Sequence, residues 1–264
     1  APGSELVDSR TGKRVWPSAA LMSKRGGNAI LALPIEDPEA SPIVAGELLR
    51  VVRVAGMKFR VRAYDGLEKR LRELGYREGD RAAPAGAGEY YYFPYDWRQG
   101  VETNGRRFAR ELDALYARAP SGTPPAIVLG HSLGGLVARY ALMYGDTPLG
   151  TSGPLPPVTW AQGAHIDTLF LIATPNEGTF LALQRLEKGV FYWRGRGGFS
   201  PETVFTYPSV FDMIPRSIAP LVDRDGKPLP FDLEDAEDWE RLGWSILDPA
   251  AESKIPYPAR RDHL

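Results

Sequence analysis

The sequence predicts an α/β protein with a mainly parallel sheet. Short apolar segments alternate with amphipathic helical segments from residue 29 to residue 175, which is typical of strands joined by helices. The chain has 264 residues, 43% of them hydrophobic and 25% charged, an ordinary globular profile long enough for one large domain. After Pro175 the alternation stops. We therefore expect one domain over residues 1–264, with a core at 1–175 and a region rich in cap or lid segments at 176–264.

The first predicted elements lie before residue 100. A short apolar run at 29–33 precedes Pro34 and indicates a strand. The segment YDGLEKRLRELGY indicates a helix, with leucines at i, i+4 and i+7. Asp65 is its predicted N-cap, Glu68 has capping-box spacing, and Gly75 suits the C-terminal end. The run at 90–93, followed by Pro94, indicates a buried strand.

The next elements surround the most informative motif. Asn104 is the predicted N-cap of a helix whose apolar face carries Phe108 and Leu112. A strand is predicted at 126–129 and a helix at 133–144, ended by Gly145. The segment HIDTLFLIATP, from residue 165, then predicts another buried strand.

The motif is Gly130-His131-Ser132-Leu133-Gly134, which fits the pattern G-x-S-x-G. Its position between a predicted strand and a predicted helix is typical of a sharp turn that exposes a nucleophilic serine. Ser132 is therefore the candidate nucleophile. The N–H of Leu133, at the start of the helix, is a candidate donor to an oxyanion.

A serine nucleophile needs a histidine base and an acid that orients it, in the order Ser, Asp or Glu, His for this type of turn. The chain has three histidines. His131 lies inside the turn and suggests a structural role, His165 comes too early in the order, and His263 is the one candidate base. Four loop aspartates are candidate acids that the sequence does not separate: Asp212, Asp225, Asp232 and Asp248.

Composition excludes several other classes of function. The absence of cysteine excludes disulfides, thiolate metal sites and a cysteine nucleophile. A net charge of −1 argues against nucleic-acid binding, and no apolar run approaches the length of a membrane span. We expect no cofactor and no metal. The first residues lack the pattern of a signal peptide, so any such segment would precede Ala1.

Five blocks, in order, resemble the lecithin:cholesterol acyltransferase family, including its bacterial lipase-like members and lysosomal phospholipase/transacylases. They are YYYFPYDWRQ, VLGHSLGGLVARYAL, LIATPNEGT, YPSVFDMIP and DWERLGW. The resemblance implies an α/β-hydrolase fold with helices on both faces of the sheet, a Ser-Asp-His triad, lipid or other ester substrates and an acyl-enzyme on Ser132. The acyl group would pass to water or an alcohol.

The resemblance also places further residues. The opening APGSEL resembles a family loop that follows the first core strand, so Ala1 would supply the second oxyanion N–H; Pro2 has none. Asp96, Trp97 and Arg98 match a block that we interpret as structural. The family's catalytic Asp and His lie well beyond the block that ends at Trp244. We therefore expect both outside this chain, which would be a fragment of a longer protein, incomplete at both ends.

Two alternatives stay open. The chain could be a non-catalytic interaction module that keeps the hydrolase fold, or a complete small esterase that uses His263. A further hypothesis concerns Phe180, Leu183, Leu186 and Val190, which share a helix face ahead of Phe191 and Trp193. They form either a packed stripe or a mobile lid with transient lipid-surface contact.

Overall fold

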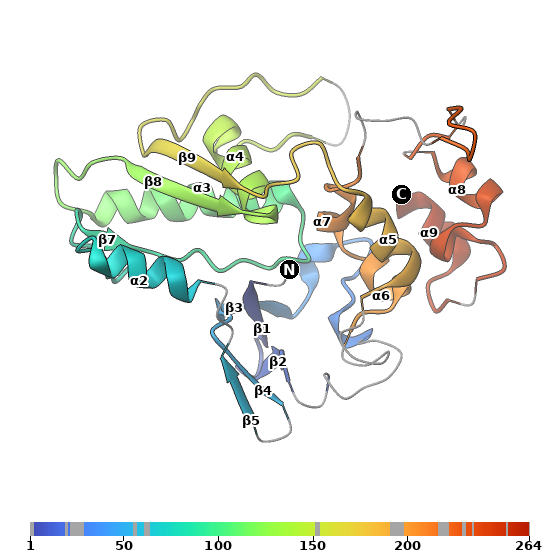
Figure 1. The fold of residues 1–264 in the computed structure, drawn as a ribbon, viewed down its shortest axis with the longest axis horizontal. Coiled ribbons are helices and arrows are strands. Elements are labelled where there is room, and N and C mark those ends of the chain that lie inside the picture. Colours follow the sequence, from blue (N-terminus) through green and yellow to red (C-terminus); the bar gives the residue numbers. More distant parts are fainter. Residues whose placement is uncertain are drawn as a thin grey trace. The chain divides into compact units, whose positions relative to one another are not determined.

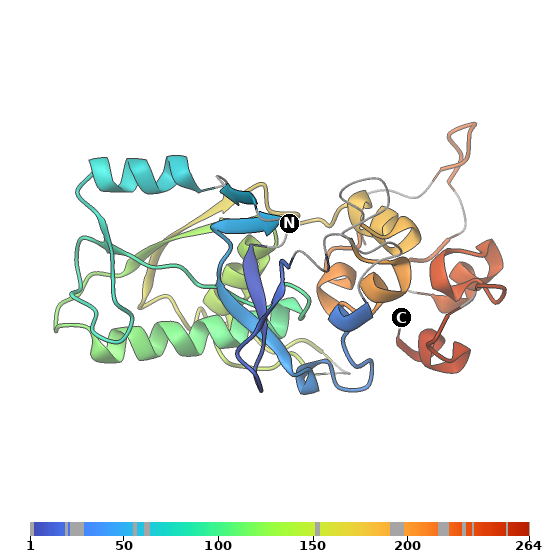
Figure 2. The ribbon, with the colours of Figure 1, turned by 90° about the horizontal axis from the view of Figure 1, so that it is seen from below.

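The fold is described from a computed structural model (Figures 1 and 2). The structure describes residues 3–18, 21, 29–54, 57–60, 64–150, 154–190, 198–215, 222–228, 231–233, 235–251 and 253–263. The chain divides into two compact units. Unit 1 comprises 1–7, 45–97 and 101–174, and unit 2 comprises 8–44, 98–100 and 175–264. One division falls at 174/175, one residue before the end of the core expected at residue 175. Whether the chain is a single catalytic domain stays a prediction.

Unit 1 contains the α/β part of the chain. Its helices and strands are β4 (Val51–Val54), β5 (Met57–Arg60), α2 (Asp65–Glu73), β6 (Arg77–Glu78), β7 (Glu89–Tyr90), α3 (Val101–Arg118), β8 (Ala126–His131), α4 (Leu133–Tyr144) and β9 (Ile166–Ile172). The strands β1 (Ser4–Asp8) and β3 (Ile43–Leu48) each run across a unit division. They form a sheet with β2 (Arg14–Trp16) in the order β2-β1-β3.

The segment β8-α4-β9 is a parallel strand–helix–strand unit, as the sequence predicts. β8 and β9 pair in parallel, with Leu129 opposite Phe170 and His131 opposite Ile172. The predicted helix has the observed bounds of α4, and Gly145 ends it with a φ of 61°. Figure 2 shows α2 on one side of these strands and α3 on the other. Mixed helices and small parallel and antiparallel sheets confirm the α/β class.

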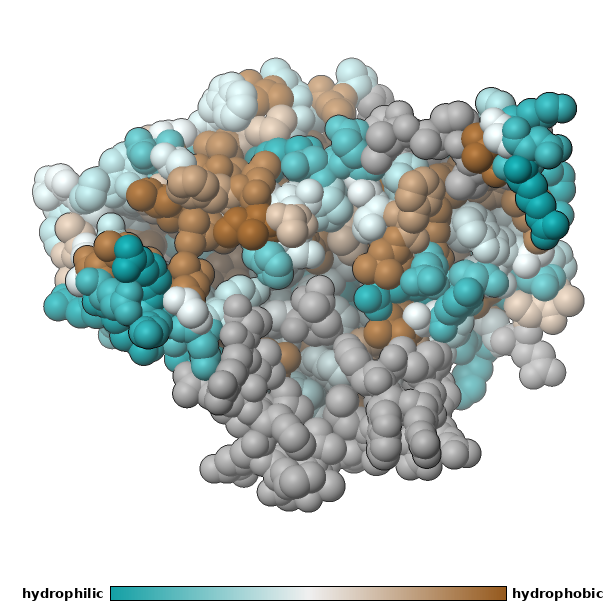
Figure 3. Space-filling model, viewed as in Figure 1, coloured by the Kyte–Doolittle hydropathy of each residue, from teal (hydrophilic) through white to brown (hydrophobic). Residues whose placement is uncertain are grey.

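The expectation that the strand after residue 165 is buried is wrong. Paired side chains of β8 and β9 point alternately to two faces, and α4 packs against only one of them. The other face carries exposed Ile127, Leu129, Phe170 and Ile172, whose exposed fractions run from 40% to 60%. Figure 3 shows apolar surface gathered in the region where Figure 1 draws β8 and β9. The part of the sheet that the structure describes has two strands, and none of the described helices covers this face closely enough to remove it from water.

Two other strand predictions need correction. The apolar run at 29–33 forms a short 3-10 helix, η1 (Ala29–Leu31), with Leu31 buried and Ile30 exposed. Of the strand predicted at 90–93, only Tyr90 lies in a strand. It is the last residue of β7, which pairs in parallel with β6. Tyr91 and Tyr92 instead direct their hydroxyls to Glu89 and Glu68. One local and one long-range tyrosine–glutamate contact stand in place of the strand ladder that the hydrophobic pattern suggested.

The predicted helices form, but their N-termini differ from prediction. α2 begins after Tyr64, and Glu68 is buried, where it accepts from Arg72 and Tyr92 instead of closing a capping box. α3 begins at Val101, so Asn104 lies in its first turn and donates to the carbonyl of Asp96. Gly75 follows α2 with a φ of 89°, as expected of a C-terminal glycine.

Unit 2 is built mainly from short helices. They are η1, η2 (Pro38–Ala40), α5 (Phe180–Lys188), α6 (Pro201–Phe205), α7 (Pro208–Phe211), α8 (Ala236–Leu242), η3 (Ser245–Leu247) and α9 (Tyr257–His263). Leu183 and Leu186 of α5 are buried against α6, α7 and η3, whereas Phe180 is exposed. Two positions of the predicted apolar stripe are therefore core. Phe191 and Trp193 lie outside the described residues.

Arg98 is fully buried in unit 2. Its guanidinium donates to the carbonyls of Leu31 and Ile43, at 3.1 and 2.6 Å. A buried charge needs such partners. The two bonds connect the chain segment before α3 to η1 and to β3. The structural role predicted for the Asp96–Arg98 block therefore has a physical basis at Arg98.

Candidate active site

Ser132 occupies a strained turn between β8 and α4. It is the N-cap of α4 with φ 55° and ψ −130°, a left-handed conformation that non-glycine residues rarely adopt. Its N–H donates to the carbonyl of Ile172 at 2.9 Å, and its carbonyl accepts from Gly135 at 2.9 Å. These bonds hold the backbone at the carboxyl ends of both parallel strands, where ligands commonly bind in α/β sheets.

Two glycines make this turn sterically possible. A Cβ at Gly130 would lie 2.6 Å from the Cα of Gly135, and one at Gly135 would lie 1.9 Å from Oγ1 of Thr174. At Gly134 the nearest atom would be the hydroxyl of Tyr95 at 3.5 Å, an ordinary contact. The pattern G-x-S-x-G names Gly130 and Gly134 but leaves out Gly135, which has the least room of the three. The doubled glycine after Leu133, together with Thr174 at the end of β9, was the available signal.

Two tyrosines from earlier in the chain lie beside the turn, and sequence reasoning missed both. The hydroxyl of Tyr64 lies 3.4 Å from Nδ1 of His131, and the two rings meet edge to face. Tyr95 lies against Gly134, and its N–H donates to the hydroxyl of Ser4. Burial raises the pKa of both phenols. They are therefore protonated hydroxyl groups, one beside His131 and the other beside Gly134.

One of the two predicted oxyanion donors lies within the described residues. Leu133 is the first residue of α4, so its N–H has no acceptor within the helix. Such an N–H can donate to a bound anion. Ala1 lies outside the described residues. Gly3 is the nearest described part of that loop, and a Cβ there would lie 3.9 Å from the Tyr64 hydroxyl.

The other two histidines have well-defined surroundings. His165 contacts Gln162 and Asp113 through Nδ1, and its ring stacks on Tyr116 at 4.4 Å. These contacts give it a structural role within unit 1.

His263 belongs to unit 2. Its Nε2 lies 3.1 Å from the carbonyl of Phe205, and its ring packs on Phe205 and Phe211. Burial lowers its pKa, partly offset by that hydrogen bond. Because a carbonyl oxygen only accepts, Nε2 carries the proton in this contact and donates it to the Phe205 carbonyl.

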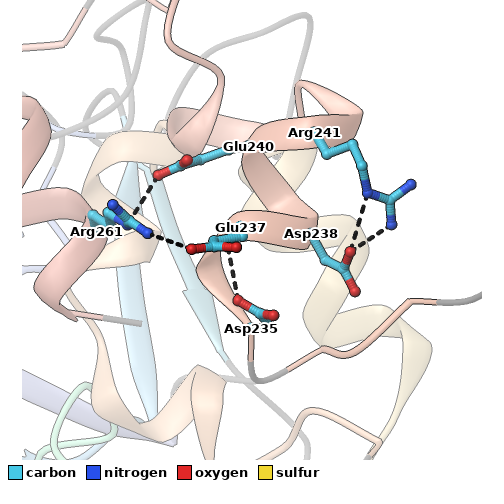
Figure 4. A pocket seen from close by; sticks show the side chains of 6 residues that line it. All are labelled: Asp235, Glu237, Asp238, Glu240, Arg241 and Arg261. Atoms are coloured by element: carbon cyan, nitrogen blue, oxygen red, sulfur yellow. Dashed lines mark hydrogen bonds and ion pairs between the residues drawn. The ribbon is translucent and has the colours of Figure 1, made fainter.

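A charged surface hollow lies in unit 2, between α8 and α9 (Figure 4). Arg261 contacts the carboxylates of Glu237 and Glu240, both at 3.2 Å, and Arg241 pairs with Asp238. Each arginine thus meets acidic groups across or along the helices, which suits helix packing and not catalysis. Among the described residues no cluster of three or more histidine or acidic side chains could hold a metal ion.

The backbone at Ser132 defines a class: an α/β protein with a serine on a strained strand-to-helix turn. The family model of lecithin:cholesterol acyltransferase matches residues 45–192, more than half of the chain and including this turn. The chain belongs to that family. Membership implies the α/β-hydrolase fold, an acyltransferase or hydrolase activity, and a lipid substrate.

The remaining comparisons add no relative. Comparison with curated proteins gave no match, and comparison with solved structures gave none either. Across the described ranges, no helix combines the length and apolar character needed to cross a bilayer.

Proposed function

We propose that this protein is a serine-dependent acyl hydrolase or O-acyltransferase that forms an acyl-enzyme on Ser132. The observation that carries the proposal is the left-handed backbone of Ser132 at the strand-to-helix turn. Such strain persists only where the surroundings impose it, and it is typical of catalytic groups. Membership of a lipid acyltransferase family supplies the chemical class.

In the proposed reaction, the Oγ of Ser132 attacks the ester carbonyl and loses its proton to a histidine base. The tetrahedral oxyanion accepts hydrogen bonds from the N–H of Leu133 and from a second donor, which we assign to Ala1. The alcohol leaves with the proton from the base. Water or another alcohol then attacks the acyl-enzyme by the same route in reverse.

The base and its acid are assigned outside residues 1–264. His131 and His165 have local partners, and His263 directs Nε2, the nitrogen that acts as base toward serine in the triad template, to the Phe205 carbonyl. The proposal accordingly treats this chain as part of a longer protein. A cap or lid formed by 176–264 belongs to the same proposal; Phe191 and Trp193, which the sequence suggests for lipid contact, lie outside the described residues.

A fluorophosphonate probe tests this proposal in the full-length protein that contains the chain. We expect covalent labelling that maps to Ser132 and is lost in Ser132→Ala. Absence of labelling in a folded protein would instead favour a non-catalytic module that keeps the fold. His263→Gln tests the second alternative, because loss of labelling in that variant, with folding intact, would identify a small esterase that uses His263.

A further inference from the structure

The segment between α4 and β9 displays apolar side chains that the proposed chemistry does not use. Leu155, Val158 and Trp160 are exposed by 67%, 39% and 60%. All three belong to unit 1, and Figure 1 shows this segment running beyond the sheet before it enters β9. Tryptophan and leucine at this exposure need an explanation when they come close together in one loop.

The backbone holds Trp160 in place. Its φ is 53°, a left-handed value that is unusual for a bulky aromatic residue. The N–H groups of Thr159 and Trp160 both donate to the carbonyl of Met143 at 3.1 Å, in the last turn of α4. The carbonyl of Trp160 accepts from Gly163 at 2.8 Å. These bonds satisfy a helix-end carbonyl and fix the turn that presents the indole to solvent.

A buried residue anchors the segment just beyond Trp160. Gln162 is 4% exposed, and its side chain bonds to Asp113 at 2.9 Å and to His165 at 3.0 Å. The exposed tryptophan is therefore attached to a well-packed base. Because this base is rigid, little conformational entropy is lost when the indole binds a surface.

Charge indicates what kind of surface this is. Residues 147–164 contain no Asp, Glu, Lys or Arg, although a quarter of the whole chain is charged. Protein interfaces are enriched in arginine and bury about 800 Å² per partner, far more than three separate side chains provide. A neutral lipid–water interface takes up each protruding apolar group separately, and tryptophan favours that boundary.

We infer that Leu155, Val158 and Trp160 form a lipid-surface contact, which we call the 155–160 contact, and that it binds neutral, zwitterionic lipid. The inference goes beyond the proposed function, because it needs no reaction at Ser132. It assigns the protein a membrane-surface attachment separate from the cap region. Binding by this contact depends on apolar insertion and not on ion pairing, so salt and anionic lipid have little effect on it.

Vesicle co-sedimentation tests the contact in the full-length protein carrying Ser132→Ala, which leaves the lipid chemically unchanged. With phosphatidylcholine vesicles, Trp160→Ser and Leu155→Ser should each lower the partition coefficient by about tenfold. Trp160→Tyr should keep most of the binding. Leu74→Ser is the matched control, because Leu74 is 59% exposed but follows charged residues of α2. Thermal midpoints establish that each variant is folded.

The outcomes separate the contact from the catalytic proposal. Equal binding by wild type, Trp160→Ser and Leu155→Ser overturns the inference, as does a loss in Leu74→Ser of the same size. Absence of vesicle binding by the folded wild type also overturns it, and a dimer that Trp160→Ser dissociates would identify a contact between two copies instead. Failure of fluorophosphonate labelling at Ser132 would overturn the proposed function and leave the vesicle result standing.

Discussion

At the scale of single residues, the turn at Ser132 is determined by atoms that sit close together in space and far apart in sequence. Gly135 touches Thr174, 39 positions later, and the Ser132 N–H bonds to Ile172. The pattern G-x-S-x-G indicated a sharp turn but not which glycine the neighbouring strand requires. Sterics settle that question, because Gly134 has space beside it and Gly135 has none.

Ser132→Ala should reduce ester turnover by about a million-fold in the full-length protein if Ser132 is the nucleophile. The substitution removes one hydroxyl, so the midpoint of thermal unfolding should change little. A p-nitrophenyl ester assay measures the turnover. A variant that keeps more than a small part of the wild-type rate would refute the assignment of Ser132.

Gly135→Ala and Gly134→Ala form a matched pair one residue apart in α4. The added methyl at 135 collides with Thr174 and should lower the free energy of unfolding by roughly 1–3 kcal/mol. At 134 the methyl has room, and alanine favours a helix over glycine by about 1 kcal/mol, so stability should hold or rise. Urea titration measures both. Equal effects at the two positions would contradict the packing described here.

At the scale of secondary structure elements, the hydrophobic periodicity of the sequence predicts the longer helices and strands correctly. It does not predict the short ones. The bounds of α4 and the existence of α2, α3, β8 and β9 follow from the hydrophobic pattern. The run at 29–33 has the same apolar composition but no strand partner, and it forms η1 instead. Composition alone does not distinguish a short strand from a short buried turn, because both need only one or two inward side chains.

The packing of α9 within unit 2 should depend on pH through His263. Burial lowers the pKa of this imidazole, so the unfolded chain binds a proton more readily than the folded chain does. Stability is therefore retained above the ordinary value near 6.5 and decreases as pH falls below it. His263→Gln keeps an N–H donor near the Phe205 carbonyl but does not titrate. Its thermal midpoint should fall less steeply than that of wild type between neutral and mildly acidic pH; parallel curves would count against this role for His263.

At the scale of the whole molecule, the sequence predicted the fold class, the family and the serine turn. It did not predict the grouping of residues 8–44 with 175–264, because that grouping rests on contacts between distant segments, such as the bond from the Leu33 N–H to the Thr206 hydroxyl. It also missed Tyr64 and Tyr95: Tyr64 opens a predicted helix segment and Tyr95 lies in a family-like block, but neither pattern indicates contact with the serine turn. Aromatic residues at irregular positions are usually core, so only coordinates single these two out.

The last prediction concerns residues 1–264 as an isolated chain. A serine without its base and acid keeps only residual catalysis over water, of order a thousand-fold, from the oxyanion donors and binding. His131, His165 and His263 are each engaged with other groups. The isolated chain should therefore show no triad-level turnover of a p-nitrophenyl ester. It should also be poorly stable, because β8 and β9 pair only with each other among the described strands and expose an apolar face.

A longer chain that includes a downstream Asp and His should restore turnover, and replacing that His with Ala should remove it again. The comparison needs both chains at equal folded concentration, so far-ultraviolet circular dichroism and thermal unfolding are measured beside the assay. Full turnover by residues 1–264, abolished by His263→Ala with folding intact, would contradict the prediction. In that case the Phe205 carbonyl bond must break during the reaction to free Nε2, and the base would come from α9 after all.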